Sequence, residues 1–268
     1  MNQLSPAKPI LAHRTDPALS VVVPVRNEAE NILPLIAEIK AALAGFAYEV
    51  IYIDDGSADP TPSRLAEAQA ALAQPHPATG TLRWQRHNRS YGQSAAIITG
   101  VRVAASPWIV TLDGDGQNDP ADIPPLLALA WAEGPKGGGP LLVTGHRTQR
   151  RDGLRKRLSS RIANAVRSRL LGDGTPDTGC GLKVFRRDAF LAIPHFDHMH
   201  RFLPALFLRA GGRVVSAPVN HRPRRSGRSN YSTIDRLLAG ILDMAGVWWL
   251  QRRWQRPAIE EARPCFWD

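Results

Sequence analysis

The sequence has little cysteine. It holds two, Cys180 and Cys265, which lie far apart in the chain. A disulfide framework needs several cysteines, and a structural zinc site needs them at short, regular spacing. Both are therefore excluded, and a reducing, cytosolic environment is expected. We expect Cys180 to be a buried small side chain rather than a nucleophile.

Long apolar runs are missing too. No stretch offers the ~18–20 uninterrupted apolar residues of a confident spanning helix. Residues 1–18 are polar, contain proline and lack the apolar core of a secretory signal. We expect them to form a flexible N-terminal arm.

Arginine, in contrast, is abundant. The formal net charge is +10 at pH 7, and lysine is scarce beside arginine. Arginine binds phosphate and carboxylate groups bidentately, so nucleic acid, an anionic membrane surface and a phosphorylated small molecule all fit as partners. A GC-rich genome would produce the same bias. Nucleic acid is disfavoured, because no recognition motif and no basic face interleaved with aromatics is visible.

Apolar, β-branched runs alternate with helical patterns through residue 147. The expected strands are residues 19–25, 48–55, 81–87, 108–115 and 141–147. Such alternation is typical of stacked βαβ units, so we predict an α/β fold with a mainly parallel sheet flanked by helices. Ligands of these sheets bind at the carboxyl ends of the strands.

The second half of the chain is more basic. Apolar residues recur at every fourth position from 154 to 170 and predict an amphipathic, cationic helix. A short strand, a helix and an edge-type strand are expected between residues 177 and 223, followed by a basic Gly/Ser-rich loop. We expect a single domain over residues 19–232 and an amphipathic segment over 233–268.

Acidic residues follow several of the expected strands. In "VTLDGDGQNDP", Asp113 and Asp115 stand one residue apart at a strand end. Paired oxygen ligands suit Mg²⁺ or Mn²⁺, although a solvated turn would use the same residues. Asp55 ends another strand, where a capping acid is the simpler interpretation. Polar ends on three strands of one sheet edge favour a binding site over turns alone.

The ordered set of motifs resembles the family 2 glycosyltransferases, and within them the dolichol-phosphate mannosyltransferase or polyprenyl-phosphate sugar transferase group. The resemblance spans about residues 19–232 and rests on "VVVPVRNEAENI", "YIDDGSADPT", "RNRSYGQSAAIITG", "VTLDGDGQNDPADI", "TGHR", "DTGCGLKVFRR", "HRFLPAL" and "RRSGRSNYS". It implies the GT-A fold, which is a Rossmann-like domain for nucleotide-diphosphate sugars.

The resemblance also implies roles for individual residues. Those implied to bind the nucleotide sugar are Pro24, Arg26, Glu28, Ile53, Asp55, Asp113, Gly114, Asp115 and Gln117. Those implied to bind the metal, Mg²⁺ or Mn²⁺, are Asp113, Asp115 and Gln117. The implied catalytic residues are Asp115, Arg147 and Lys183, and those implied to hold an acceptor phosphate are Arg224, Arg225, Arg228 and Ser229.

This sequence departs from the family pattern at two positions. Arg26 stands where the family commonly has an aromatic residue, so a guanidinium stack would replace a base stack. Asn230 stands where the family commonly has Lys, so Arg225 or Arg228 would have to replace that phosphate contact.

The implied reaction is an inverting sugar transfer from a nucleotide-diphosphate sugar to a polyprenyl phosphate. Because a phosphate acceptor is already an anion, the reaction needs no general base. A saccharide or glycolipid hydroxyl acceptor would need one, and His200 or Asp197 are the candidates. A non-catalytic membrane-surface protein is the alternative from another class. The spacing of His195, His198 and His200 fits no strong metal site.

The C-terminal apolar run is too short to span a bilayer. Residues 237–250 would form a helix of roughly 21 Å, against a hydrocarbon core of ~30 Å, and Asp243 interrupts the run. Trp248, Trp249 and the following arginines suit a membrane interface. A helix packed on the domain fits equally well. We expect a peripheral protein on the cytoplasmic face of the inner membrane, with GDP-mannose, UDP-glucose and UDP-amino sugars all open as donors.

Overall fold

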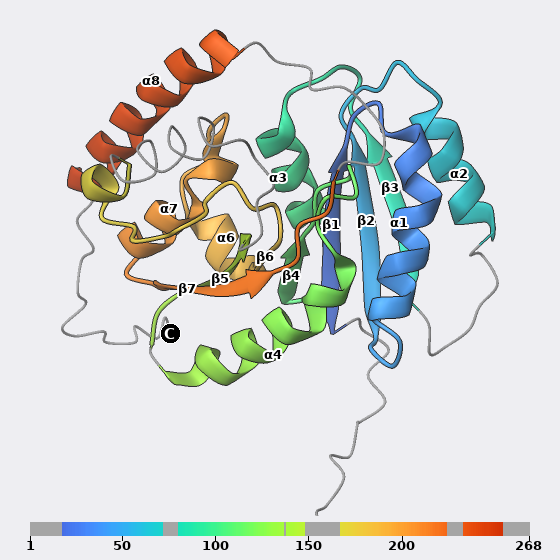
Figure 1. The fold of residues 1–268 in the computed structure, drawn as a ribbon, viewed down its shortest axis with the longest axis horizontal. Coiled ribbons are helices and arrows are strands. Elements are labelled where there is room, and N and C mark those ends of the chain that lie inside the picture. Colours follow the sequence, from blue (N-terminus) through green and yellow to red (C-terminus); the bar gives the residue numbers. More distant parts are fainter. Residues whose placement is uncertain (1–17, 72–79, 137, 148–166, 224–232, 254–268) are drawn as a thin grey trace, which may run out of the picture.

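The computed structural model describes residues 18–71, 80–136, 138–147, 167–223 and 233–253. Seven strands form one mixed sheet in the order β3-β2-β1-β4-β6-β5-β7 (Figure 1). The strands are β1 (Leu19–Val25), β2 (Tyr48–Asp54), β3 (Thr81–Arg86), β4 (Trp108–Thr111), β5 (Leu141–Arg147), β6 (Lys183–Arg186) and β7 (Arg213–Val219). The five strands predicted from the sequence are confirmed, although β4 ends four residues early, before the acidic turn.

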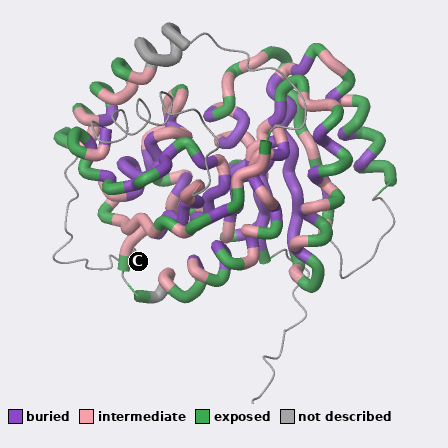
Figure 2. Tube along the Cα trace, viewed as in Figure 1, coloured by how far each residue is buried: buried purple, intermediate pink, exposed green. Residues whose placement is uncertain are grey.

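Helices cover both faces of the sheet (Figure 1). They are α1 (Ala29–Ala42), α2 (Thr61–Ala71), α3 (Gln93–Val103), α4 (Ile123–Glu133), α6 (Arg187–Ala192), α7 (Leu203–Arg209) and α8 (Thr233–Arg252), with short 3-10 turns η1 (Pro120–Asp122), η2 (Gly134–Lys136) and η3 (Met199–Arg201). One core cluster joins β1 to α1, α2 and α4, and a second joins it to α3, α6 and α7. Val21 and Val23 belong to the first cluster and Val22 to the second, which explains why β1 is apolar at consecutive positions. Figure 2 shows the buried residues concentrated in the sheet and on the helix sides that face it.

Strand β6 is the exception to the parallel pattern. It runs antiparallel between β4 and β5, and its first residue, Lys183, lies opposite Thr111 at the end of β4. An antiparallel strand begins where its neighbour ends. The loop before β6 is thereby delivered to the carboxyl edge of the sheet, next to the acidic turn after β4.

Some predicted segments lie outside the described residues. They are the arm of residues 1–17, most of the basic helix predicted to precede residue 171, and the basic loop that carries Arg224, Arg225, Arg228 and Ser229. Residues 167–171 are the described end of that helix.

The C-terminal helix α8 packs on the domain, which is one of the two alternatives left open by the sequence. Val247 is 1% exposed, and Met244 and Trp248 contact the second core cluster. Asp243, which interrupts the apolar run, accepts a bond of 3.0 Å from His198 Nδ1. Within the described part of the chain, none of the helices combines the length and hydropathy that crossing a bilayer requires.

Candidate active site at the carboxyl edge of the sheet

The acidic turn after β4 has a defined geometry. Gln117 N–H donates to Asp115 Oδ1 at 3.0 Å, and Asp113 N–H donates to Asn118 Oδ1 at 3.3 Å. A side chain at Gly114 would overlap Val25, so glycine lets the turn lie against β1. The turn is thereby held at the carboxyl edge, beside the end of β1. Asp119 accepts from Ala121 N–H at 3.0 Å and caps η1, as expected for an acid at a helix start.

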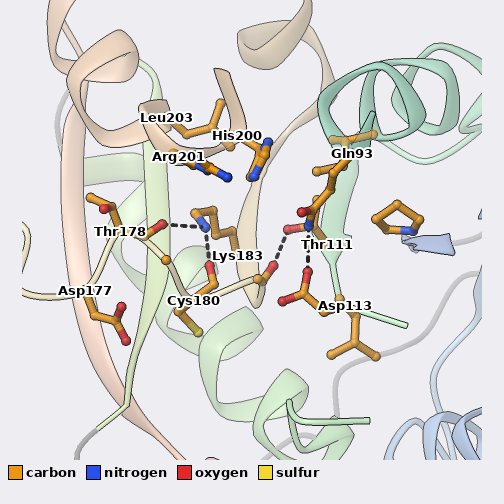
Figure 3. A pocket seen from close by; sticks show the side chains of 15 residues that line it. Gln93, Thr111, Asp113, Asp177, Thr178, Cys180, Lys183, His200, Arg201 and Leu203 are labelled. Carbon is orange, nitrogen blue, oxygen red and sulfur yellow. Dashed lines mark hydrogen bonds between the residues drawn. The ribbon is translucent and has the colours of Figure 1, made fainter. Parts of the chain in front are cut away.

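A cavity of about 360 Å³ opens beside this turn (Figure 3). Its walls come from the ends of β1 and β4, the start of α3, the loop before β6, and η3. The polar lining residues are Gln93, Thr111, Asp113, Asp177, Thr178, Cys180, Lys183, His200 and Arg201. Pro24, which the resemblance implies binds the nucleotide, also lines it, together with Ile97, Leu112 and Leu203.

Asp113 is the central carboxylate of the cavity. Gln93 Nε2 donates to its Oδ1 at 2.8 Å, and a side chain at Gly181 would overlap its carboxyl group. Burial, together with the neighbouring charge of Asp115, raises the pKa of Asp113 to about 6, against the opposing effects of Lys183 and Arg147. A bound cation would favour the ionised form of this carboxylate.

The donor set fits a divalent metal held partly by substrate. Within the described residues, no group of three or more His, Cys, Asp or Glu side chains is placed to hold a metal ion. Mg²⁺ typically takes one or two carboxylates and completes its shell with water and substrate phosphates. Asp113 and Asp115 supply such a pair. Gln117, the third implied ligand, lies in the same turn.

Lys183 and Arg147 are both engaged with other protein groups. The ammonium of Lys183 donates to the carbonyl oxygens of Thr178, at 3.4 Å, and Cys180, and burial lowers its pKa. Arg147 binds Asp177 through Nε at 2.6 Å and Nη2 at 2.8 Å. Lys183 therefore forms part of the cavity wall, whereas Arg147 braces the loop behind that wall through Asp177.

The loop before β6 has a second support, which the sequence did not reveal. Arg167 is 8% exposed and donates to Asp173 Oδ2 at 3.1 Å, to Thr175 O at 2.7 Å and to Thr178 Oγ1. Cys180 is 0% exposed, which confirms the prediction of a buried residue. The cavity wall from Thr178 to Gly181 is thus held by buried charges on its outer side.

Asp55 organises the loop that leads into α3. Its carboxylate accepts from the N–H groups of Tyr91 and Gly92 at 2.8 Å each, from Ser90 Oγ at 2.7 Å and from His87 Nδ1 at 2.8 Å. Burial would raise its pKa, but these hydrogen bonds outweigh that effect and the pKa is lowered. In this structure the carboxylate therefore fixes residues 87–92, and with them Gln93.

The other residues implied to bind the nucleotide are dispersed. Ile53 is 0% exposed and packs in the core beneath α3, so its side chain does not reach the cavity. Arg26 is exposed. Glu28 lines a separate hollow of about 480 Å³ between the starts of α1 and α2. Of the predicted nucleotide residues, the structure gathers Pro24 and the acidic turn in one place, and leaves Ile53 and Glu28 elsewhere.

The three clustered histidines, His195, His198 and His200, contact different partners. His195 Nε2 contacts Phe190 O at 3.2 Å, and His198 Nδ1 contacts Asp243. His200 Nδ1 lies 2.8 Å from Ser94 Oγ, and its ring lines the cavity. Arg201, beside it, also lines the cavity. The "HRFLPAL" motif carried the resemblance, but no role was predicted for Arg201.

His200 should make stability depend on pH. Burial lowers its pKa well below 6.5, so the folded state binds fewer protons there than the unfolded state. His200 therefore contributes fully to folding stability above about pH 6.5, which is its pKa in the unfolded state. This contribution is lost as the pH falls through the pKa of His200 in the folded state. We expect the wild type to lose more thermal stability than His200→Gln between pH 7 and 5, measured by thermal unfolding. His195→Gln is the control, and equal losses in the wild type and His200→Gln would contradict the assignment.

Comparisons with known proteins agree with this architecture. Residues 20–193 match the family described as Glycosyl transferase family 2. The dodecaprenyl-phosphate galacturonate synthase of Rhizobium johnstonii is 35% identical over 244 residues, which is 89% of this chain and 69% of that protein. The undecaprenyl-phosphate 4-deoxy-4-formamido-L-arabinose transferase of Klebsiella pneumoniae is 36% identical over 80% of this chain. This chain spans 62% of that protein.

The fold is also shared with solved structures. Glucosyl-3-phosphoglycerate synthase from Mycobacterium tuberculosis, in complex with Mn²⁺, UDP and glucosyl-3-phosphoglycerate, superposes with a TM-score of 0.60 at 19% identity, covering 88% of this chain and 80% of that one. A complex of the same enzyme with Mg²⁺ and UDP gives a TM-score of 0.59 at 20% identity, covering 86% of this chain and 80% of that one. At this identity the likeness establishes the GT-A architecture. Together with the family match and the relatives, it shows that the chain belongs to glycosyl transferase family 2.

Proposed function

We propose that the protein transfers a sugar, with inversion, from a nucleotide-diphosphate sugar to a polyprenyl phosphate, in a reaction that depends on Mg²⁺ or Mn²⁺. The observation that carries the proposal is one cavity that joins the acidic turn after β4 to two cations. Asp113 lines one wall, with Asp115 beside it in the same turn, and Lys183 and Arg201 line another. The named relatives act on dodecaprenyl and undecaprenyl phosphates, which supports this acceptor class.

The residues of the cavity suit this chemistry. Asp113 and Asp115, with Gln117, would hold the divalent ion, which supplies positive charge to the diphosphate leaving group when bound. Gln93 orients Asp113, and Asp55 holds the loop that carries Gln93. Lys183 adds a buried positive charge to the cavity in which the anionic substrates would meet.

The basic loop remains our candidate for part of the acceptor site. Arg222 lies just before this loop, and its backbone N–H donates to Gln117 O at 2.9 Å. His221 forms a β-bridge with Asn118. The loop with Arg224, Arg225, Arg228 and Ser229 therefore leaves the described domain directly beside the acidic turn. This proximity supports its proposed role in binding acceptor phosphate.

A hydroxyl acceptor is less well supported by the cavity. It would need a general base whose pKa lies near the working pH. His200 faces the cavity, but its pKa is lowered well below 6.5, which makes it a weak base. Asp197, the other candidate, is 65% exposed and bonds to His198 N–H. Both observations favour an acceptor that already carries its charge.

The test is an acceptor comparison with the full chain. Labelled GDP-mannose, UDP-glucose and UDP-amino sugars would each be offered with undecaprenyl phosphate, diacylglycerol or a disaccharide. We expect label to enter the undecaprenyl phosphate fraction with one donor class and not the other acceptors. Transfer to diacylglycerol or the disaccharide, without transfer to the lipid phosphate, would refute the proposed acceptor.

We also propose that the protein is peripheral on the cytoplasmic face of the inner membrane, bound through α8. The helix buries one side on the domain and leaves Leu242 73% and Trp249 53% exposed, seven residues apart on the outer side. Arg252 lies 3.8 Å from the Trp248 ring and Arg253 lies 5.8 Å from the Trp249 ring. An exposed apolar face edged by Trp and Arg suits a membrane interface.

Charged substitutions on this face should weaken membrane binding. Leu242→Glu combined with Trp249→Glu is expected to lower affinity for anionic liposomes at least about tenfold, because each large apolar side chain contributes roughly 1.5–3 kcal/mol when buried. Flotation measures the bound fraction. Trp131→Glu, at a 42% exposed position on α4, is the matched control and should bind like the wild type. Unchanged flotation of the double variant would refute α8 as the membrane contact.

A further inference from the structure

One wall of the cavity carries two cations, of which Lys183 is balanced in part by Asp113 and Asp177. Arg201 and Lys183 are its cations, and Asp113 and Asp177 are the acids among the lining residues. Asp177 is bound bidentately by Arg147, and Asp113 is held by Gln93 at the opposite wall. Among the described residues, no ion pair or hydrogen bond of the Arg201 guanidinium is found. The wall therefore has the charge of an anion site.

His200 adds a neutral donor to the same wall. Ser94 Oγ accepts the backbone N–H of His200 at 3.2 Å and lies 2.8 Å from His200 Nδ1. The Ser94 hydroxyl can donate its proton to Nδ1, and in that tautomer the ring N–H of His200 is on Nε2. Figure 3 shows the ends of His200, Arg201 and Lys183 pointing toward the same part of the cavity, across from Asp113.

We propose that His200 and Arg201, together with Lys183, bind the phosphate of the lipid acceptor inside the cavity. This inference rests on the proposed function and adds two residues to the site predicted on the basic loop. A phosphate monoester presents three oxygens, and the wall presents an imidazole N–H, a guanidinium fork and an ammonium. A guanidinium binds phosphate bidentately, so Arg201 would also fix the orientation of the attacking oxygen.

Phosphate oxygens are also present in the donor, but the donor diphosphate is assigned to the opposite wall. Asp113 and Asp115 would hold the divalent ion that binds the leaving group there, and inversion requires the acceptor to attack from the other side of the sugar. A second observation agrees with an acceptor on this wall. His198, two residues before His200, binds Asp243 of α8, so the segment that carries the anion site is joined to the proposed membrane-contacting helix. A lipid held by its phosphate here would have its chain near α8.

The test separates the acceptor from the donor. We expect Arg201→Ala to raise the KM for undecaprenyl phosphate about 10- to 100-fold, which corresponds to one charge-assisted hydrogen bond. The KM for the nucleotide sugar should stay within about twofold. Arg201→Lys should recover part of the loss. Arg102→Ala removes an exposed arginine of α3 outside the cavity and should behave like the wild type.

The role of His200 as a hydrogen-bond donor to the acceptor phosphate is tested by two substitutions. His200→Gln keeps a neutral N–H donor and should retain more acceptor affinity than His200→Phe. Binding of undecaprenyl phosphate in detergent is measured directly for each variant, and stabilisation by nucleotide sugar with metal confirms that each is folded. An Arg201→Ala variant with a raised donor KM and an unchanged acceptor KM would place the donor phosphate here and overturn the inference. Unchanged KM values for both substrates would also overturn it, whereas a wild type without lipid-phosphate transfer would instead refute the proposed function.

Discussion

Asp115→Ala should reduce sugar transfer by about 10²–10³-fold, because it removes one of the two carboxylates proposed to hold the divalent ion against the leaving diphosphate. The charge of Asp115 raises the pKa of Asp113, and a bound cation would relieve the repulsion between the two carboxylates. The variant leaves Asp113 in place but without its partner. Steady-state transfer at saturating donor, with Mg²⁺ or Mn²⁺, measures the loss.

A neighbouring acid gives the control for this prediction. Asp119 lies four residues further along the same loop and caps η1 by accepting from Ala121 N–H. Asp119→Ala should cost about 1 kcal/mol of stability, as the loss of a helix cap does, and should leave transfer within a few-fold of the wild type. If Asp115→Ala and Asp119→Ala had the same small effect, the metal role of Asp115 would be wrong.

Asp55→Ala should lower the free energy of unfolding by about 3–5 kcal/mol. The buried carboxylate accepts from four donors of the loop before α3, two of them backbone N–H groups, and its loss leaves those donors unpaired. Thermal unfolding at neutral pH should show a Tm lowered by roughly 6–20 °C, at about 2–4 °C per kcal/mol. Donor affinity should fall as well, because the loop positions Gln93 against Asp113.

Asp59→Ala is the graded comparison for Asp55→Ala. Asp59 accepts from two backbone N–H groups, that of Ala29 at the start of α1 and that of Thr61 at the start of α2. Asp59→Ala should lower the free energy of unfolding by only about 1 kcal/mol and should leave the affinity for the donor unchanged. A Tm for Asp55→Ala equal to that of Asp59→Ala would show that the loop before α3 does not depend on Asp55.

The sequence predicted the part of the fold that depends on local patterning. The first five strands follow from apolar runs, and the acidic turn follows from the point where β4 stops. The position of β6 could not be predicted, because "KVFR" is as compatible with a parallel partner as with an antiparallel one. Its antiparallel pairing places Lys183 opposite Thr111, and this long-range contact brings the cation to the cavity.

The candidate site was predictable to a similar extent. Asp113 and Asp115 stand out by residue type and spacing, whereas the sequence does not show that the Ile53 side chain packs in the core, because a strand residue can face either side of a sheet. Arg201 was missed because one arginine among many carries no local signal. Its significance is that it forms no ion pair with a carboxylate among the described residues, and that property appears only when the chain is folded.

The most direct test of the account is transfer of labelled sugar to undecaprenyl phosphate by the full chain, with and without divalent metal. We predict that label enters the lipid with Mg²⁺ or Mn²⁺, that excess chelator abolishes the transfer and that added metal restores it. Undecaprenol, which lacks the phosphate, should accept no label under the same conditions. Full transfer in excess chelator, or equal labelling of undecaprenol and undecaprenyl phosphate, would contradict the account.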